Sequence, residues 1–320
     1  MRVSSERRSR TASGAEGPIF QRGARASSIL SPLNDSTSVI SRTGDASRSG
    51  AIADMIRKDM NKPPIFIIGC PRSGTSLLRL ILDSHSQISS GPETHFLVEL
   101  AKIFGPYWER LERFGFDRDY WSTRIADFFS SFQIEYAKKR GKSRWCEKTP
   151  RYTEHLDFID TLFPDAQFLH VIRHGLDVVA SHRDRWGLFR AIRASDTWRN
   201  YVTLGRTFGG RLPAERYLEL RYEDLVLHAE ETGRKIFDFL NEPWELAVLE
   251  YERSDHDMSE DGTQFRRRRR REGGDDAMIF RSRIGAGARE AGPMLQALFW
   301  IKSRKLLAEL GYSWRGVEST

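Results

Sequence analysis

The chain has little cysteine and no long apolar run, and both shortages restrict what it can be. Two cysteines in 320 residues, Cys70 and Cys146, cannot form the disulfide framework of a small secreted domain. No apolar stretch approaches the roughly 20 residues that a membrane-spanning helix needs. We find no internal repeat. These absences predict a protein of a reducing compartment, the cytoplasm, without a membrane span.

The N-terminal segment lacks bulky apolar side chains, since Phe20 is the sole aromatic residue before Phe66. It is instead rich in serine and arginine, and such a segment cannot bury enough apolar surface to offset its ordering entropy. We therefore expect residues 1–60 to be a disordered extension. Its acidic residues and the lack of an amphipathic run argue against a transit peptide.

The rest of the chain, residues 61–316, is long enough for one domain with a substantial core, because 39% of the whole chain is hydrophobic. Apolar runs suited to buried strands lie at 65–69, 168–172 and 217–221. Helical patterns alternate with them at 76–84, 94–104, 151–163, 175–186, 229–240 and 293–311. The alternation predicts an α/β protein with a central parallel β-sheet flanked by helices. A further helix is expected over 117–139, as a cap above a substrate cleft.

The most informative segment is Cys70-Pro71-Arg72-Ser73-Gly74-Thr75-Ser76, which stands between the first apolar run and the first helical pattern. A strand, a Gly-containing loop and a helix in this order direct backbone N–H groups and the positive helix end at an anion. A P-loop NTPase needs Lys after the second Gly to reach the β- and γ-phosphates, whereas this chain has Thr75 there and carries its cation at Arg72. The pattern suits one 5′-phosphosulfate better than a triphosphate with Mg²⁺, so we expect no metal. A Gly-containing turn that binds nothing is the alternative.

Three segments in the same order resemble the sulfotransferases that use 3′-phosphoadenosine 5′-phosphosulfate (PAPS), in particular the tyrosylprotein branch and its bacterial relatives. They are PPIFIIGCPRSGTSLLRLILDSHSQISSGPETHFL, FLHVIRHGLDVVASHRDRW and LRYEDLVLHAEETGRKIFDFLNEPWE. The resemblance covers residues 62–314. It implies a P-loop-like, three-layer sulfotransferase fold and PAPS as the sulfuryl donor.

Residue types and the resemblance together indicate a nucleotide site. Arg173 ends the second apolar run, where open α/β sheets bind ligands, and Ser181 and Arg185 are four residues apart on one helical face. In the resembling family these three positions hold the 3′-phosphate, while a surface salt bridge is the alternative for the arginine. The resemblance assigns the following residues to the donor: Arg72, Ser73, Gly74, Thr75, Ser76, Arg173, Ser181, Arg185, Tyr222, Ser282 and Arg283.

The candidate catalytic residues are Glu93, Lys148 and Arg72. Glu93, in GPETHF, is our general base, because a carboxylate among apolar neighbours has the raised proton affinity that deprotonating a hydroxyl needs. The resembling tyrosylprotein enzymes carry their base at this position. Lys148, in WCEKTP, matches the family lysine that contacts the transferring group, and with Arg72 it would stabilise charge on the leaving phosphate. A helix-terminal carboxylate and a solvated lysine are the alternatives.

The chain departs from the resembling family at two places. The tyrosylprotein enzymes join a cysteine at the position of Cys146 to one near the base, but Ser90 occupies the second position here, so that bridge cannot form. The segment of residues 280–285 resembles the loop that closes over the nucleotide in the family. Relatives often continue this loop with Lys-Trp, whereas this chain continues with Ala286 and Gly287. His85 is an alternative candidate for the general base, but we interpret it as a structural residue.

Six consecutive arginines, Arg266 to Arg271, support a hypothesis of a different class. Runs of like charge contact nucleic acid in many proteins, and the chain has a formal net charge of +7. A nucleic-acid-binding protein is therefore the alternative, and a non-catalytic PAPS-binding relative is a third. Because aromatic residues do not interleave the run, we favour a mobile Arg-rich loop over 258–278, which attracts an acidic acceptor into the cleft. The acceptor hydroxyl, on a peptide, a glycan or a small molecule, and the oligomeric state stay open.

Overall fold

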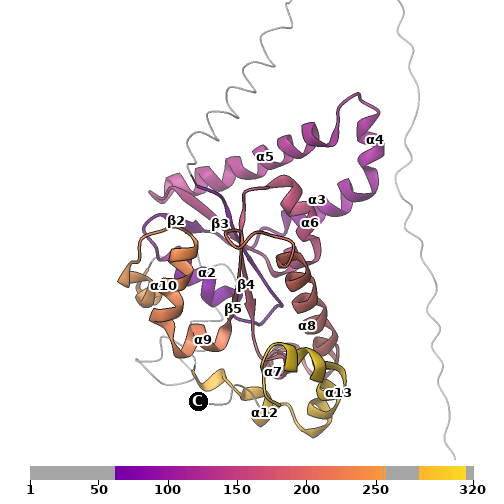
Figure 1. Ribbon diagram of the computed structural model, residues 1–320, viewed down its shortest axis with the longest axis vertical. Helices are drawn as coiled ribbons and strands as arrows, with labels where there is room; N and C mark the ends of the chain where they lie inside the picture. The colour runs from indigo at the N-terminus through magenta and orange to yellow at the C-terminus, as the bar shows by residue number, and fades with distance from the viewer. Residues whose placement is uncertain (1–61, 255, 257–280, 315–320) are drawn as a thin grey trace, which may run out of the picture. The chain divides into compact units, whose positions relative to one another are not determined.

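The computed structural model describes residues 62–254, 256 and 281–314, all of which belong to one compact unit that spans residues 46–320. The expected extension over 1–60 and the expected Arg-rich loop over 258–278 lie outside the described residues. The described part forms a single parallel β-sheet with helices on both faces (Figure 1). The three-layer α/β fold is thereby confirmed.

The sheet has five strands in the order β2-β3-β1-β4-β5, and every neighbouring pair is parallel. Its strands are β1 Ile65–Ile68, β2 Ile88–Ser90, β3 Arg144–Lys148, β4 Gln167–Ile172 and β5 Tyr217–Arg221. The three predicted apolar runs correspond to β1, β4 and β5. Because all strands run the same way, their carboxyl ends meet at one edge of the sheet.

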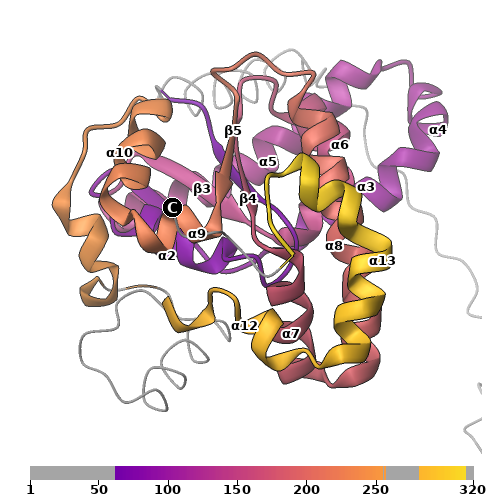
Figure 2. The same cartoon turned by 60° about the horizontal axis from the view of Figure 1, so that its bottom comes forward.

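The α-helices fill the connections between the strands and extend beyond the sheet (Figure 2). They are α2 Thr75–Asp83, α3 Phe96–Phe104, α4 Trp108–Glu112, α5 Arg118–Lys139, α6 Leu156–Leu162, α7 Gly175–Trp186, α8 Leu188–Gly209, α9 Tyr222–Leu227, α10 Ala229–Phe239, α12 Ala286–Glu290 and α13 Pro293–Glu309. The short 3₁₀ helices are η1 Gly105–Tyr107, η2 Pro150–His155, η3 Leu246–Arg253 and η4 Arg281–Arg283. The predicted helix over 117–139 is α5, which Asp117 caps by accepting a hydrogen bond from the backbone N–H of Tyr120 at 2.8 Å. None of the described helices is long and apolar enough to cross a membrane.

Alternate residues of β1 divide the core between the two faces of the sheet. Ile65 and Ile67 pack toward α2, α9 and α10, whereas Phe66 and Ile68 pack toward α3, α5 and α6. All four side chains are buried, and burying each one contributes roughly 1.5–3 kcal/mol. This packing fixes the position of the loop that follows β1.

Candidate functional site

The predicted site residues lie where the five parallel strands end. The loop of residues 69–74 follows β1, Glu93 follows β2, Lys148 ends β3, Arg173 follows β4 and Tyr222 follows β5. In the sequence these positions are spread over 154 residues, from Gly69 to Tyr222. The parallel topology collects them at one edge of the sheet.

The loop after β1 requires glycine at two positions. Gly69 and Gly74 have φ angles of 141° and 102°, which side-chain-bearing residues rarely adopt. A Cβ atom on Gly69 would lie 2.5 Å from the carbonyl oxygen of Val171, and one on Gly74 would lie 2.3 Å from Cδ2 of Tyr222. The loop therefore packs tightly on β4 and α9 and delivers the chain to the N-terminus of α2, where backbone N–H groups lack intrahelical partners.

We expect Gly74→Ala to lower the free energy of unfolding by at least about 2 kcal/mol, because strain at positive φ adds to the overlap with the Tyr222 ring. Urea unfolding measures the difference. Gly105→Ala is the matched control, since a Cβ there meets no atom within 4 Å and the φ angle is −50°. If Gly74→Ala is as stable as the Gly105→Ala control, the loop is not held against Tyr222.

Arg72 and Arg173 connect this loop to its neighbours. The Nε of Arg72 donates to Ser181 Oγ of α7 at 3.1 Å. The Arg173 guanidinium lies 4.4 Å from the centre of the Tyr222 ring and donates to the backbone carbonyls of Arg72 at 3.4 Å and of Arg283 at 2.5 Å. The structure thus brings together five predicted residues from separate segments.

Three of the residues assigned to the donor have buried polar atoms suited to an anion. Among the described residues, Ser73 Oγ, Arg173 Nε and Arg283 Nε are buried without a hydrogen-bond partner. Burying such groups unpaired costs about 1–3 kcal/mol each, and a phosphate oxygen would pair with each of them. The donor set therefore fits a phosphorylated nucleotide.

Two other predicted donor residues, Arg185 and Ser282, belong to α7 and η4. Arg185 is on the exposed side of α7, with its guanidinium 6.0 Å from the Trp186 ring. Ser282 belongs to η4, and its side chain lies outside what the structure describes. Arg283 forms ion pairs with Asp184 at 3.1 Å and Glu290 at 3.4 Å.

Glu93 and Lys148 are in contact. The Nζ of Lys148, only 1% exposed as a side chain, donates to Glu93 Oε1 and to Ser76 Oγ at 3.3 Å. Glu93 Oε2 also lies 3.3 Å from Nε2 of His95. The surroundings of Glu93 thus differ from the apolar ones we expected, because a buried cation and a histidine face its carboxylate. The base candidate and the cation candidate both lie next to the start of α2.

Glu147, next to Lys148, is a buried residue whose carboxylate accepts several hydrogen bonds. Its carboxylate accepts hydrogen bonds from the Thr94 N–H at 3.4 Å, the Thr94 hydroxyl at 3.2 Å, the Thr149 hydroxyl at 2.8 Å and the Gln133 amide at 2.8 Å. Burial nevertheless raises the pKa of Glu147 to about 7, against an ordinary value of 4.5. Glu147 therefore ties the residue after Glu93 to β3 and to α5.

Helix α2 also holds the segment that leads to Glu93. The guanidinium of Arg79 donates to the carbonyls of Ser90 and Gly91, both at 3.0 Å. The Ser90 N–H donates to Asp83 at 2.8 Å, and His256 Nδ1 lies 2.6 Å from the same carboxylate. Arg79 and Asp83 are buried in the structure, and no motif in the sequence marked them.

The histidines near the site engage in structural contacts. His85 is buried, lies 2.9 Å from the Pro243 carbonyl and stacks on Phe237. Burial lowers the pKa of His170 to about 3 and that of His182 to about 4, so both rings are neutral near pH 7. Burial also lowers the pKa of His174.

Ser90 and Cys146 are neighbours, as the resemblance implied for the family's bridge positions. The Ser90 hydroxyl donates to the Cys146 carbonyl at 2.9 Å, and the Cys146 thiol is free and buried. Burial raises the pKa of this thiol to about 12, which keeps it protonated. A hydrogen bond therefore joins β2 and β3 at the place of the bridge.

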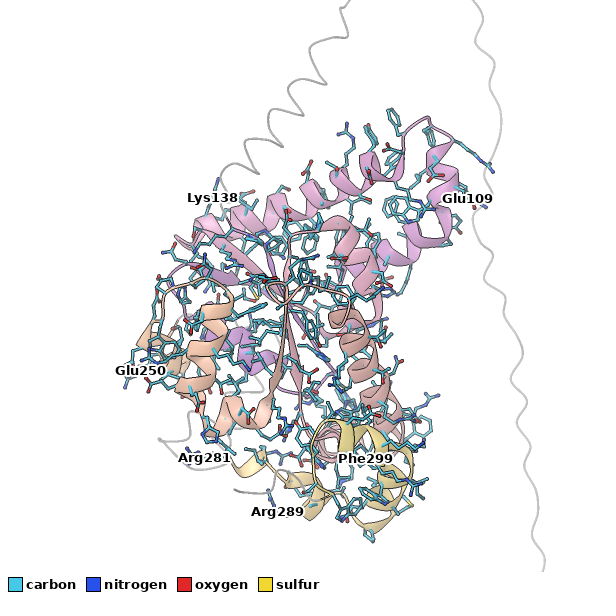
Figure 3. The ribbon with its side chains drawn as sticks, in the orientation of Figure 1. Glu109, Lys138, Glu250, Arg281, Arg289 and Phe299 are labelled. Carbon is cyan, nitrogen blue, oxygen red and sulfur yellow. The ribbon has the colours of Figure 1, made fainter. Side chains whose placement is uncertain are left out.

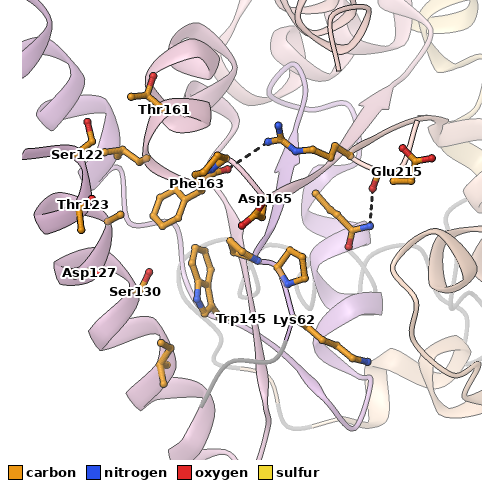
Figure 4. Close-up of a pocket in the computed structure, with 18 of the residues that line it drawn as sticks. Lys62, Ser122, Thr123, Asp127, Ser130, Trp145, Thr161, Phe163, Asp165 and Glu215 are labelled. Atoms are coloured by element: carbon orange, nitrogen blue, oxygen red, sulfur yellow. Dashed lines mark hydrogen bonds between the residues drawn. The ribbon is translucent and has the colours of Figure 1, made fainter. Parts of the chain in front are cut away.

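A cavity of about 1060 Å³ lies at the opposite edge of the sheet, between α5, α6 and the starts of the strands (Figure 4). Its lining includes Pro64, Trp145 and Gln167, and none of the predicted site residues. Within the described residues, no group of three or more metal-ligating side chains is arranged to hold an ion.

Comparisons with known proteins agree with the geometry. A model of the sulfotransferase family matches residues 63–246. The protein-tyrosine sulfotransferase of Drosophila melanogaster is 31% identical over 204 residues, which is 59% of this chain and 40% of that protein. Protein-tyrosine sulfotransferase 1 of Danio rerio is 31% identical over 232 residues, which is 69% of this chain and 63% of that protein. The matches therefore span less than two thirds of the length of each of these two relatives.

One solved structure supports the fold alone. The sulfotransferase domain from the Synechococcus PCC 7002 olefin synthase aligns with a TM-score of 0.51 and 21% sequence identity. The alignment covers 79% of this chain and 97% of that domain.

Proposed function

This chain belongs to the sulfotransferase family, and we propose that it moves the sulfuryl group of PAPS to an acceptor hydroxyl. The observation that carries the proposal is that two clusters lie at the loop of residues 69–74 and at the start of the helix that follows it. Arg72, Arg173 and Ser181 contact one another at the loop, and the Glu93–Lys148 pair contacts Ser76 in the first turn of α2. An anion site next to a paired acid and cation is what transfer of an anionic group from a nucleotide requires.

On this proposal, the loop and Arg72 hold the phosphosulfate, and Arg173, Ser181 and Arg185 hold the 3′-phosphate. Ser181 Oγ already accepts a hydrogen bond from Arg72, so its own proton is available to a phosphate oxygen. Tyr222, Ser282 and Arg283 complete the nucleotide contacts. The unpaired Arg173 Nε and Ser73 Oγ support this assignment.

The proposed reaction is an in-line displacement at sulfur. The acceptor oxygen forms a bond to sulfur while the bond from sulfur to the phosphate oxygen breaks, and Glu93 takes the acceptor proton. Negative charge then grows on the departing phosphate. Arg72 and Lys148 stabilise that charge, and the reaction needs no metal ion.

The proposal is tested by calorimetric titration with 3′-phosphoadenosine 5′-phosphate (PAP), the desulfonated product, against ATP and adenosine 5′-phosphosulfate. We expect PAP to bind most tightly, and Arg173→Ala to weaken its binding at least tenfold, because a buried charge-assisted contact contributes about 1.5–3 kcal/mol. Arg183→Ala is the control, since Arg183 lies in α7, the helix that follows Arg173, and pairs with the exposed Asp184. Equal affinity for PAP and adenosine 5′-phosphosulfate would contradict the assignment of the 3′-phosphate site.

The acceptor is proposed from similarity. Because relatives named protein-tyrosine sulfotransferases match this chain, a tyrosine peptide is the first acceptor to test, followed by carbohydrates and small phenols. We do not propose nucleic-acid binding through Arg266–Arg271. That run lies outside the described residues, so no described contact supports this function. A non-catalytic relative would bind PAP but transfer nothing, which the same acceptor screen distinguishes.

A further inference from the structure

The turn between α7 and α8 carries apolar side chains that face solvent. In the segment of residues 183–193, which we name the α7–α8 tip, the exposed apolar residues are Trp186, Leu188, Phe189 and Ile192. Phe189 is 70% exposed. Figure 2 shows this turn at the end of the helical layer formed by α7, α8 and α13, away from α10. Exposed apolar groups gathered on one tip mark a contact surface, since such patches are rare on soluble monomers.

The same tip is strongly basic. It contains Arg183, Arg185, Arg190 and Arg193, against Asp184 as its single acid. Asp184 is already neutralised, because Arg283 lies 3.1 Å and Arg183 lies 3.9 Å from its carboxylate. The Arg193 guanidinium lies 5.4 Å from the centre of the Phe189 ring. Apolar and cationic groups are therefore interleaved, and their charge is complementary to an anionic surface.

A second exposed aromatic tip provides a comparison. Phe114, 72% exposed, lies between α4 and α5, at the end of the molecule where Figure 3 labels Glu109. Residues 109–119 carry three arginines and four acidic residues, so their charges nearly cancel. The two tips thus expose an aromatic ring to a similar extent. They differ in charge, because only the α7–α8 tip has an excess of positive charge.

The α7–α8 tip is continuous with the loop after β1. The Trp186 ring lies 4.8 Å from the His182 ring and 6.0 Å from the Arg72 guanidinium. His182 Nε2 is 3.4 Å from the carbonyl of Pro71. A surface bound at the tip would therefore lie beside the loop that we assign to the phosphosulfate.

We propose that the α7–α8 tip binds the surface of an anionic phospholipid membrane and so presents the site to membrane-bound acceptors. Aromatic and aliphatic side chains enter the headgroup boundary, while Arg190 and Arg193, which have no role in the nucleotide assignment, extend their stems to the lipid phosphates. A convex tip with exposed Leu188 and Ile192 suits a bilayer better than a nucleic acid, which offers no apolar boundary. The acceptor part of this inference rests on the proposed sulfotransferase function, whereas membrane binding does not.

The first test labels the tip directly. Both native cysteines are buried, so Phe189→Cys in the full chain gives one accessible thiol for an environment-sensitive fluorophore. We expect its emission to rise at least twofold on vesicles of phosphatidylcholine with phosphatidylglycerol, and not on phosphatidylcholine alone. The control is Phe114→Cys, which we expect to stay unchanged on both. Equal signals from the two labels, or none from Phe189→Cys, would overturn the proposal.

The second test separates the tip from the run Arg266–Arg271, which is another concentration of positive charge in the sequence. Vesicle sedimentation compares the wild type, Leu188→Ser with Phe189→Ser, and a variant with Arg266–Arg271 changed to serine. We expect the tip variant to lose at least about tenfold in partition to anionic vesicles, since apolar burial and charge act together. Binding that persists in the tip variant and disappears in the arginine-run variant contradicts the proposal. Neither readout needs PAPS or turnover, so failure here leaves the proposed activity untouched.

Discussion

Glu93→Gln is expected to reduce sulfuryl transfer by at least about a hundredfold while PAP affinity stays within about twofold. Glutamine retains the shape of the side chain and its Oε1 still accepts from Lys148, but an amide cannot take the acceptor proton. The change therefore removes the proposed base and keeps the contact with Lys148. Transfer of label from PAPS to an acceptor found with the wild type measures turnover, and calorimetry with PAP measures binding.

Glu99→Gln is the matched control for this experiment. Glu99 lies on the nearby helix α3 and pairs with Lys102 at an exposed position, so its loss should leave turnover unchanged. If Glu93→Gln turns over at the wild-type rate, Glu93 is not the base. If PAP affinity falls as steeply as turnover, Glu93 instead holds the loop of residues 69–74 in place through Lys148 and Ser76.

The parts of the fold that the sequence predicts are those with regular apolar patterns. Strands β1 and β4 are mainly apolar because all of their residues are buried, whereas β5 is only partly buried and shows its apolar residues at Leu218 and Leu220. The helix expected over 117–139 is α5. The strand β3 has no such pattern, since Arg144, Glu147 and Lys148 interrupt it. These charged side chains are buried only because partners from distant segments meet them.

Helix α8 was also absent from the sequence prediction, although its buried face has helical spacing. That face includes the small residues Ala191, Ala194 and Gly205, but also Trp198, Tyr201, Val202 and Phe208, and its members recur every three or four residues. Gly205 is needed because a Cβ atom there would lie 2.4 Å from Cε1 of His170. The helix therefore has a readable apolar periodicity that the sequence prediction missed, and Gly205 lets it pack closely on β4.

The candidate site was predictable at residues that follow strands or match motifs, and not at the residues that support them. Arg72, Glu93, Lys148 and Arg173 each stand in a recognisable segment, and the structure brings them to one edge of the sheet. Glu147 belongs to no motif that would mark it, other than its place next to Lys148. Its role depends on Thr94 and Gln133, whose approach to β3 is a property of the folded chain.

Glu147→Gln is expected to stabilise the protein by about 2–3 kcal/mol more at pH 8 than at pH 5. Burial raises the pKa of Glu147 to about 7 from 4.5, so the native protein binds this proton more tightly than the unfolded chain does. The associated stability is present below pH 4.5 and is lost as pH rises through 7, where an ionised carboxylate must stay buried. Glutamine has no proton to lose, and urea unfolding of both proteins at the two pH values measures the difference.

The comparison isolates one group, because all other titrating residues occur in both proteins and cancel. Gln133 can present its amide oxygen to the new amide, and the remaining oxygen still accepts from Thr94 and Thr149, so the variant can fold with little rearrangement. A stability difference that does not change with pH would mean that the four donated hydrogen bonds keep Glu147 ionised throughout. The pH-dependent result would instead show that the chain retains a costly buried carboxylate beside Lys148, where it fixes the segment that carries Glu93.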